Sequence, residues 1–212
     1  MVEYNFTELA LDNTNKYTPY LDTTSTVALG ANGLVLTTAA TDTKTATQSQ
    51  GGVYWYPNTM VPAVEFKFKI DVITNAAIFA GLSDAVSEAT SLLPFGLVTA
   101  TLTDTATDGA GFLFDTRQTL DYFNIVNTKA GTEAFTQLAS TYVPVADTWL
   151  TLRVEIDTSG NALYYWNGSP VGYKANAVTA GTPLVPFFGI RNNSATAHIA
   201  TLRCVRAWGN NT

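Results

Sequence analysis

The chain contains a single cysteine, Cys204, and a single histidine, His198, among its 212 residues. One cysteine excludes a disulfide within the chain and an all-cysteine zinc site, and one histidine excludes a zinc site of three histidines. On an extended strand their spacing would separate the two side chains by roughly 20 Å, so they cannot act as a catalytic pair. We therefore expect Cys204 to be a small buried side chain. We expect no cofactor and no metal ion.

Charge is also scarce. Asp, Glu, Lys and Arg make up 13% of the residues, about half of the usual ~25%, and the net charge is −6 with only 11 basic residues. Nucleic acids and anionic membranes bind clustered basic side chains. The nearest approach to a cluster is Arg191, Arg203 and Arg206, which is thin. We expect neither nucleic acid nor membrane as a partner.

No apolar run reaches the ~20 residues that cross a bilayer, so no transmembrane segment is expected. The first residues, Met1 to Phe6, lack the basic and apolar regions of a signal peptide. We expect a protein that folds in a cytoplasm, or one that is exported without such a signal.

Two stretches alternate strictly between apolar and polar residues, Ala63–Val72 and Trp149–Asp157. This period of two predicts strands with one face in a core and one in water. After the second stretch come the turn residues 158–161, a returning strand Ala162–Trp166, and a tight turn at Asn167-Gly168. Further strands are predicted at Gly33–Thr38, Gly52–Tyr56, Ala76–Gly81, Phe112–Asp115, Tyr122–Asn127, Pro186–Arg191 and Ala197–Ala207.

Nine or ten short strands with almost no helix predict an all-β fold, a two-sheet antiparallel jelly-roll β-sandwich. We expect one structural domain, in which residues 51–212 form the sandwich. Residues 1–50 form an N-terminal arm and the first strands, packed on the domain or extending from it. Leu36–Gln50 is rich in Thr and Ala, and is either a long exposed loop or an arm that orders against a partner. Thr99–Gly111 is predicted to be a loop, and Asp84–Leu93 one short helical turn.

Four segments carry a resemblance to the concanavalin A-like lectin/glucanase superfamily. They are 149–157, a Trp-led strand that ends in Asp; 160–168, a Tyr-containing strand that ends in Asn-Gly; and the final strands 187–192 and 200–208. The resemblance implies a jelly roll, a fold that hosts enzymes, sugar binders and shell proteins. A Thr/Ala-rich N-terminus and low charge also look like virion structural proteins of tailed bacteriophages.

In the laminarinase-type glucanases of that superfamily, one strand carries Glu-x-Asp-x-Glu, whose first and last acids act as nucleophile and general acid. This chain has Glu155 and Asp157, but Ser159 stands where the second Glu is required. A second carboxylate could come only from another strand, for instance from Glu65. We therefore expect no catalytic residues and no enzyme. A glycan hydrolase or lyase is the least favoured of three functions.

Two other groups of residues could bind a ligand. Asp104 and Asp108 in a Gly- and Thr-rich stretch offer oxygen ligands for calcium, although such residues also form ordinary turns. Exposed aromatic rings can stack on sugars, and the candidate carbohydrate-binding residues are Tyr54, Trp55, Tyr56 and Trp166. The alternative is that these rings belong to the sandwich core.

The leading hypothesis from the sequence is a virion structural protein that decorates a phage capsid or forms part of a fibre or knob. Its partners would be the major capsid protein or another virion protein, and a second copy of the chain is a further candidate. Its location would be the virion, assembled in the host cytoplasm. The alternative is a lectin-like module that binds a glycan.

Overall fold

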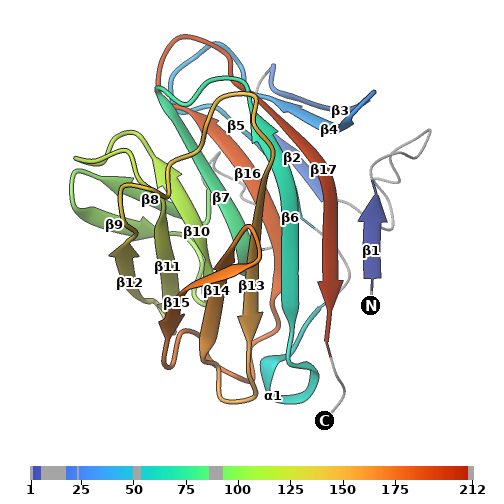
Figure 1. Ribbon diagram of the computed structural model, residues 1–212, viewed down its shortest axis with the longest axis vertical. Coiled ribbons are helices and arrows are strands. Elements are labelled where there is room, and N and C mark those ends of the chain that lie inside the picture. The colour runs from blue at the N-terminus through green and yellow to red at the C-terminus, as the bar shows by residue number, and fades with distance from the viewer. Residues whose placement is uncertain (1, 6–17, 23, 50–53, 86–92, 210–212) are drawn as a thin grey trace.

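The computed structural model describes residues 2–5, 18–22, 24–49, 54–85 and 93–209. Its architecture is two large antiparallel sheets packed face to face, with one short helix, α1 (Pro57–Met60) (Figure 1). The prediction of an all-β, two-sheet jelly roll is confirmed. The predicted helical turn at Asp84–Leu93 and the start of the predicted strand Gly52–Tyr56 lie largely outside the described residues.

Sheet A has the strand order β15-β14-β13-β6-β17-β4-β3, and β1 also pairs with β17. Its members are β1 (Val2–Asn5), β3 (Thr26–Gly30), β4 (Gly33–Thr37), β6 (Ala63–Ile70), β13 (Leu150–Ile156), β14 (Ala162–Trp166), β15 (Ser169–Lys174) and β17 (Ile199–Trp208).

Sheet B has the strand order β12-β11-β10-β7-β16-β5-β2. Its members are β2 (Thr18–Leu21), β5 (Thr45–Ser49), β7 (Ala76–Ser83), β10 (Gly109–Asp115), β11 (Asn124–Lys129), β12 (Thr132–Gln137) and β16 (Val185–Asn192). A separate hairpin joins β8 (Phe95–Val98) to β9 (Thr101–Asp104), at the left of Figure 1.

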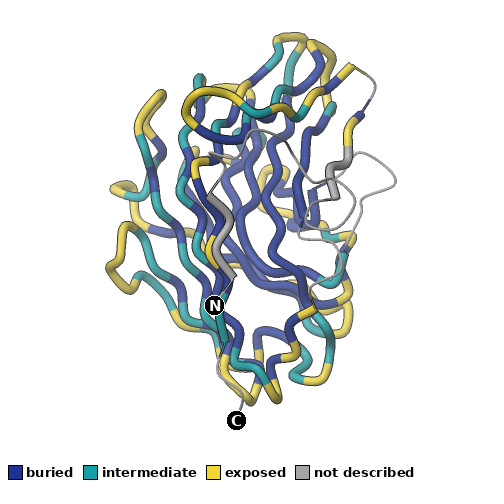
Figure 2. The backbone as a smooth tube through the Cα atoms, turned by 90° about the vertical axis from the view of Figure 1, so that its right-hand side faces the viewer, coloured by how far each residue is buried: buried dark blue, intermediate teal, exposed yellow. Residues whose placement is uncertain are grey.

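The main core lies between the sheets and follows the predicted alternation. Phe66 and Phe68 of β6 point inward from sheet A and contact Phe188 of β16, with ring centroids 6.0 and 4.9 Å apart. On β13, the inward residues are buried, whereas Thr151, Arg153 and Glu155 are half-buried on the outside. Buried residues fill the middles of the strands, and exposed ones gather at the turns (Figure 2).

A second apolar cluster covers the outer face of sheet B. The β8–β9 hairpin buries Phe95, Leu97 and Leu102 against Phe79 and Phe187, with the remaining members on β7, β10, β11 and the segment before β8. The prediction of a loop at Thr99–Gly111 is therefore wrong for β9 and for the start of β10. Leu102 is the only large apolar residue of β9, so its Thr and Asp residues gave no sign of a buried strand. Because this hairpin occupies the outer face of sheet B, the outer face of sheet A is the more open of the two.

The interpretation of Leu36–Gln50 as an exposed loop holds for residues 40–43 but is wrong for residues 45–49. Residues 45–49 form β5, whose five residues are all buried between β16 and β2. The small Thr, Ala and Ser side chains fit between neighbouring layers, and the ladder satisfies their backbone groups. The sequence did not predict this strand, because β5 contains no large apolar residue.

Two glycines at turns, Gly160 and Gly168, allow the cost of a strained backbone to be separated from the cost of a steric clash. Gly160 and Gly168 have similar positive φ angles, 79° and 84°. A Cβ at Gly168 would meet nothing within 4 Å, but one at Gly160 would lie 2.2 Å from the Val178 carbonyl oxygen. We expect Gly168→Ala to cost about 1 kcal/mol of unfolding free energy, and Gly160→Ala at least about twice that. Urea unfolding of both variants measures the difference, and equal losses would contradict it.

Candidate functional site

The structure does not bring the four predicted aromatic residues together. Tyr54 and Tyr56 are 45% and 40% exposed, whereas Trp55 is 5% exposed and its backbone pairs with Leu184. Trp55 therefore offers no flat surface to a sugar. Tyr56 precedes α1, which is joined to the end of β13 by the backbone hydrogen bond from Ile156 to Pro62. Trp166 lies towards the other end of β13, paired with Leu152.

Trp166 does line an open pocket, and a second tryptophan joins it there. This tryptophan pocket has a volume of about 180 Å³ and lies where the segment before β13 meets the end of β14. Trp149 and Trp166 are both half-buried, whereas Thr141, Thr148 and Asn167 are exposed residues. The remaining lining residues are Val143, Pro144, Val145 and Leu150. Rings combined with a few polar groups are typical of small-ligand sites.

The surrounding packing fixes the position of the Trp166 ring. Phe123 and Tyr142 meet it edge-on, with centroids 5.2 and 5.5 Å away. Immediately after it, Asn167 and Gly168 both have positive φ and close the hairpin predicted at this turn. The Asn167 side-chain oxygen accepts a hydrogen bond of 2.9 Å from the Thr151 backbone amide. The pocket is thus preformed, because core contacts and a turn hold its tryptophan in place.

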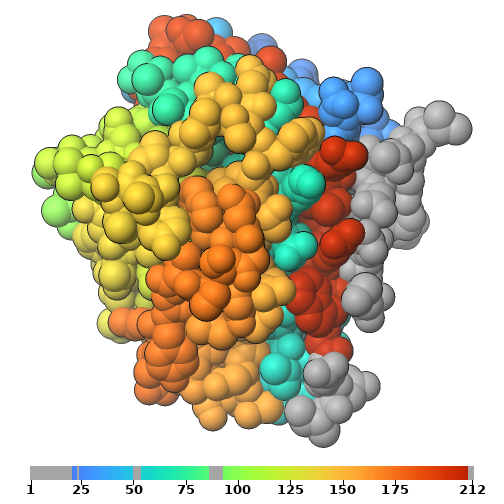
Figure 3. Space-filling view, in the orientation of Figure 1, coloured from blue at the N-terminus to red at the C-terminus, as the bar shows by residue number. Residues whose placement is uncertain are grey.

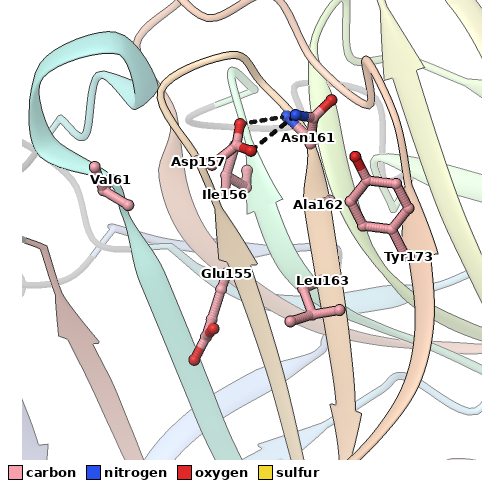
Figure 4. Close-up of a pocket in the computed structure, with 8 residues that line it drawn as sticks. All are labelled: Val61, Glu155, Ile156, Asp157, Asn161, Ala162, Leu163 and Tyr173. Atoms are coloured by element: carbon pink, nitrogen blue, oxygen red, sulfur yellow. Dashed lines mark hydrogen bonds between the residues drawn. The ribbon is translucent and has the colours of Figure 1, made fainter.

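The two acids of the incomplete glucanase motif have structural partners. Asp157 accepts hydrogen bonds from the Ser159 and Asn161 backbone amides and from the Asn161 side chain, at 2.8–2.9 Å. Burial would raise the pKa of Asp157, but these hydrogen bonds lower it. Figure 4 shows the Asp157 carboxylate facing Asn161, while Glu155 points away from both. The acid at 157 organises the turn, as expected of a strand end.

Glu155 lines a second pocket of about 220 Å³, which is mostly hydrocarbon and has Tyr173 at one side (Figure 4). The Glu155 carboxylate lies 3.2 Å from Arg153 and accepts a hydrogen bond of 3.1 Å from the Tyr165 hydroxyl. Burial and this hydrogen bond raise the pKa of Tyr165. Glu65, the other carboxylate considered, lies 3.7 Å from Arg206. Each carboxylate is thus close to its own guanidinium group.

The remaining candidates are separated. Asp108 is buried and accepts hydrogen bonds from Thr179 and Thr182, so its oxygens hold a loop. Asp104 lines a different, small cavity. Within the described ranges, no three His, Cys, Asp or Glu residues gather as a metal site would require. Cys204 is 6% exposed, which confirms its predicted burial.

Comparison with known proteins supports the fold. No protein-family model matches the sequence, and no curated protein matches it. The chain is similar in structure to LamAcat from Zobellia galactanivorans, with 9% identity, a TM-score of 0.69, and coverage of 98% of this chain and 96% of that one.

Two other solved structures are similar over nearly their whole length. A Bacillus licheniformis β-glucanase has 11% identity and a TM-score of 0.65, over 99% of this chain and 98% of that one. Peanut lectin has 13% identity and a TM-score of 0.65, over 100% and 98%. The fold is thus the lectin/glucanase jelly roll.

These similarities correct one prediction. The prediction that the chain is not an enzyme is contradicted, because LamAcat and a β-glucanase are among the solved structures that share its fold. At this level of identity the neighbours show the fold alone. They give no support to the predicted phage origin, capsid partner or virion location. In the part of the chain that the structure describes, no helix is long and apolar enough to cross a membrane.

Proposed function

We propose that the protein binds carbohydrate, and that the tryptophan pocket is its binding site. The observation that carries this proposal is the placement of Trp149 and Trp166 around one preformed pocket that exposed Thr and Asn residues also line. The flat apolar face of a sugar ring stacks on an aromatic ring, and its hydroxyls need hydrogen-bonding partners at the rim. The lectin among the structural neighbours supports the same function.

This proposal changes the set of candidate residues. Trp166 stays in it, Trp149 joins it, and Trp55 leaves it because its side chain is buried. Tyr54 and Tyr56 are exposed but lie near α1, away from the tryptophan pocket. The sequence did not mark Trp149 as a candidate, because this residue was interpreted only as the first residue of a strand.

The test is a glycan array with neutral and acidic oligosaccharides, including the laminaritriose and laminaritetraose that a variant of the Zobellia protein binds. Calorimetry on the best ligand follows. We expect Trp149→Ala and Trp166→Ala each to weaken binding about tenfold, since one stacking contact is worth on the order of 1–2 kcal/mol. Phe135→Ala is the matched control, because that ring is 38% exposed on β12 in the other sheet.

Trp166 also packs on Phe123, so its variant can lose stability as well as binding. Trp149→Ala leaves those core contacts in place and separates the two effects. Circular dichroism and the thermal midpoint check that each variant is folded. The proposal fails if no oligosaccharide binds, or if folded Trp149→Ala binds as tightly as the Phe135→Ala control.

A further inference from the structure

The outer face of sheet A gathers basic side chains that are spread along the sequence. Five of the basic residues that the structure describes lie on it: Lys67, Lys69, Arg153, Arg203 and Arg206. They come from the adjacent strands β13, β6 and β17, which lie about 4.8 Å apart in a sheet. In Figure 3, β6 (teal) and β17 (red) are visible beside the orange strands. This basic strip belongs to a chain whose net charge is −6.

A β-bulge is what places both arginines of β17 on this face. The register between β17 and β6 shifts between Leu202 and Cys204. Thr201 before the shift, Arg203 at it and Arg206 after it lie on the outer face, whereas Val205 is buried. Without the extra residue, strict alternation would turn Arg206 toward the core. The bulge therefore increases the positive charge of the outer face.

Ion pairs neutralise only part of the strip. Arg206 pairs with Glu65, Arg153 with Glu155, and Lys69 with Asp147. Among the described residues, Lys67 and Arg203 have no acidic partner. They are neighbours, because Lys67 is opposite Cys204 and Arg203 occupies the bulge beside it. The strip thus keeps two unpaired positive charges at its centre.

Trp149 connects the strip to the tryptophan pocket. Its ring centroid lies 5.9 Å from the Lys69 ammonium and 5.6 Å from the Arg203 guanidinium, and the same residue lines the pocket. A ligand stacked on this ring would therefore have two cations within reach of its substituents. From Leu150 to Ile156, β13 spans roughly 20 Å, enough for more than one sugar residue.

We infer that the site prefers acidic glycans, whose carboxylate or sulfate groups would contact Lys67, Lys69 and Arg203 beside the tryptophan pocket. This inference rests on the proposed carbohydrate binding and adds the class of ligand. A nucleic acid fits less well, because two unpaired cations are few for phosphate binding and the remaining charge of the chain is negative.

The test compares two forms of one glycan. Polygalacturonate oligomers carry charged carboxylates, whereas their methyl esters are uncharged. At about 0.1 M salt the Debye length is about 10 Å. Acidic side chains on distant faces of the protein are therefore screened from the ligand, whereas the basic strip beside it still attracts its negative charge. We expect the free acid to bind about tenfold more tightly than the ester at that salt, and the difference to shrink at about 0.5 M.

A double variant, Lys67→Gln with Arg203→Gln, should remove most of this preference, so that the acid and the ester bind with similar affinities. Lys129→Gln is the control, since it removes one positive charge from β11 in the other sheet. Equal affinities for acid and ester would overturn the inference, and so would a preference that survives the double variant. Single-stranded DNA that binds as tightly as the acid would show a general polyanion surface and also overturn it.

These outcomes separate the two proposals. Binding of a neutral glycan that depends on Trp149, with no gain from added carboxylates, contradicts the acidic preference and leaves the carbohydrate-binding proposal standing. If neither neutral nor acidic glycans bind, both proposals fail.

Discussion

Replacing Asp115 by alanine should cost about 3–5 kcal/mol of unfolding free energy, because it would leave a buried arginine without its partner. The Asp115 carboxylate is fully buried and lies 2.6 Å from Arg191, which is 3% exposed. Arg117 and Asn193 also donate hydrogen bonds to it, at 3.0 Å each. The Leu97 backbone amide donates another, which ties the β8–β9 hairpin to sheet B.

Asp147→Ala is the control for this variant. Asp147 pairs with Lys69 at 2.9 Å, a similar distance, but its side chain is 69% exposed. We expect a loss of less than about 1 kcal/mol there, because solvent screens the pair. Urea unfolding compares the two variants, and similar losses would show that burial does not decide the effect.

The same carboxylate should make stability depend on acid pH. Burial would raise the pKa of Asp115, but Arg191, Arg117 and the hydrogen bonds outweigh burial and lower it. A carboxyl group whose pKa is lower in the folded state stabilises that state above its unfolded value of about 3.9. This contribution is lost as the pH falls below that value. Wild-type protein should lose more stability than Asp115→Ala between about pH 4 and pH 2.

Phe188→Ala should also cost about 3–5 kcal/mol, because it would open a cavity between the two sheets. Phe188 is fully buried on β16, and its ring meets Phe66 and Phe68 of β6. It therefore joins the sheets directly. Since a domain is stable by only about 5–15 kcal/mol, this one side chain accounts for a large share.

Phe135→Ala is again the matched control, since it removes the same atoms from a ring that is 38% exposed on β12. We expect a loss of less than about 1 kcal/mol from it. Urea unfolding measures both losses. An unchanged slope of the unfolding free energy against urea concentration would show that the variant differs in stability alone. A small loss for Phe188→Ala would mean that neighbouring side chains collapse into the space.

The strands with alternating sequences were predictable, and so was the tight turn between β14 and β15. Ala63–Ile70 and Leu150–Ile156 bury every second residue as expected. Asn167-Gly168 closes its turn because both residues accept a positive φ. The β8–β9 hairpin and β5 were missed, since their polar or small residues are buried by neighbours that composition does not reveal.

The candidate site was only partly predictable. Trp166 was a candidate because it is aromatic, but its pocket depends on Trp149 and on a loop that precedes β13. The signal that could have revealed the bulge is the apolar pair Cys204-Val205 between Arg203 and Arg206, which breaks the alternation of the last strand.

The sequence by itself determined the all-β class, the alternation of β6 and β13 and the tight turns, because these follow from neighbouring residues and the geometry of an extended chain. Only the tertiary structure decided which charges share a face and which rings share a pocket. Lys69, Trp149 and Arg203 are far apart in the chain, and they meet because strand order in a sheet depends on long-range pairing.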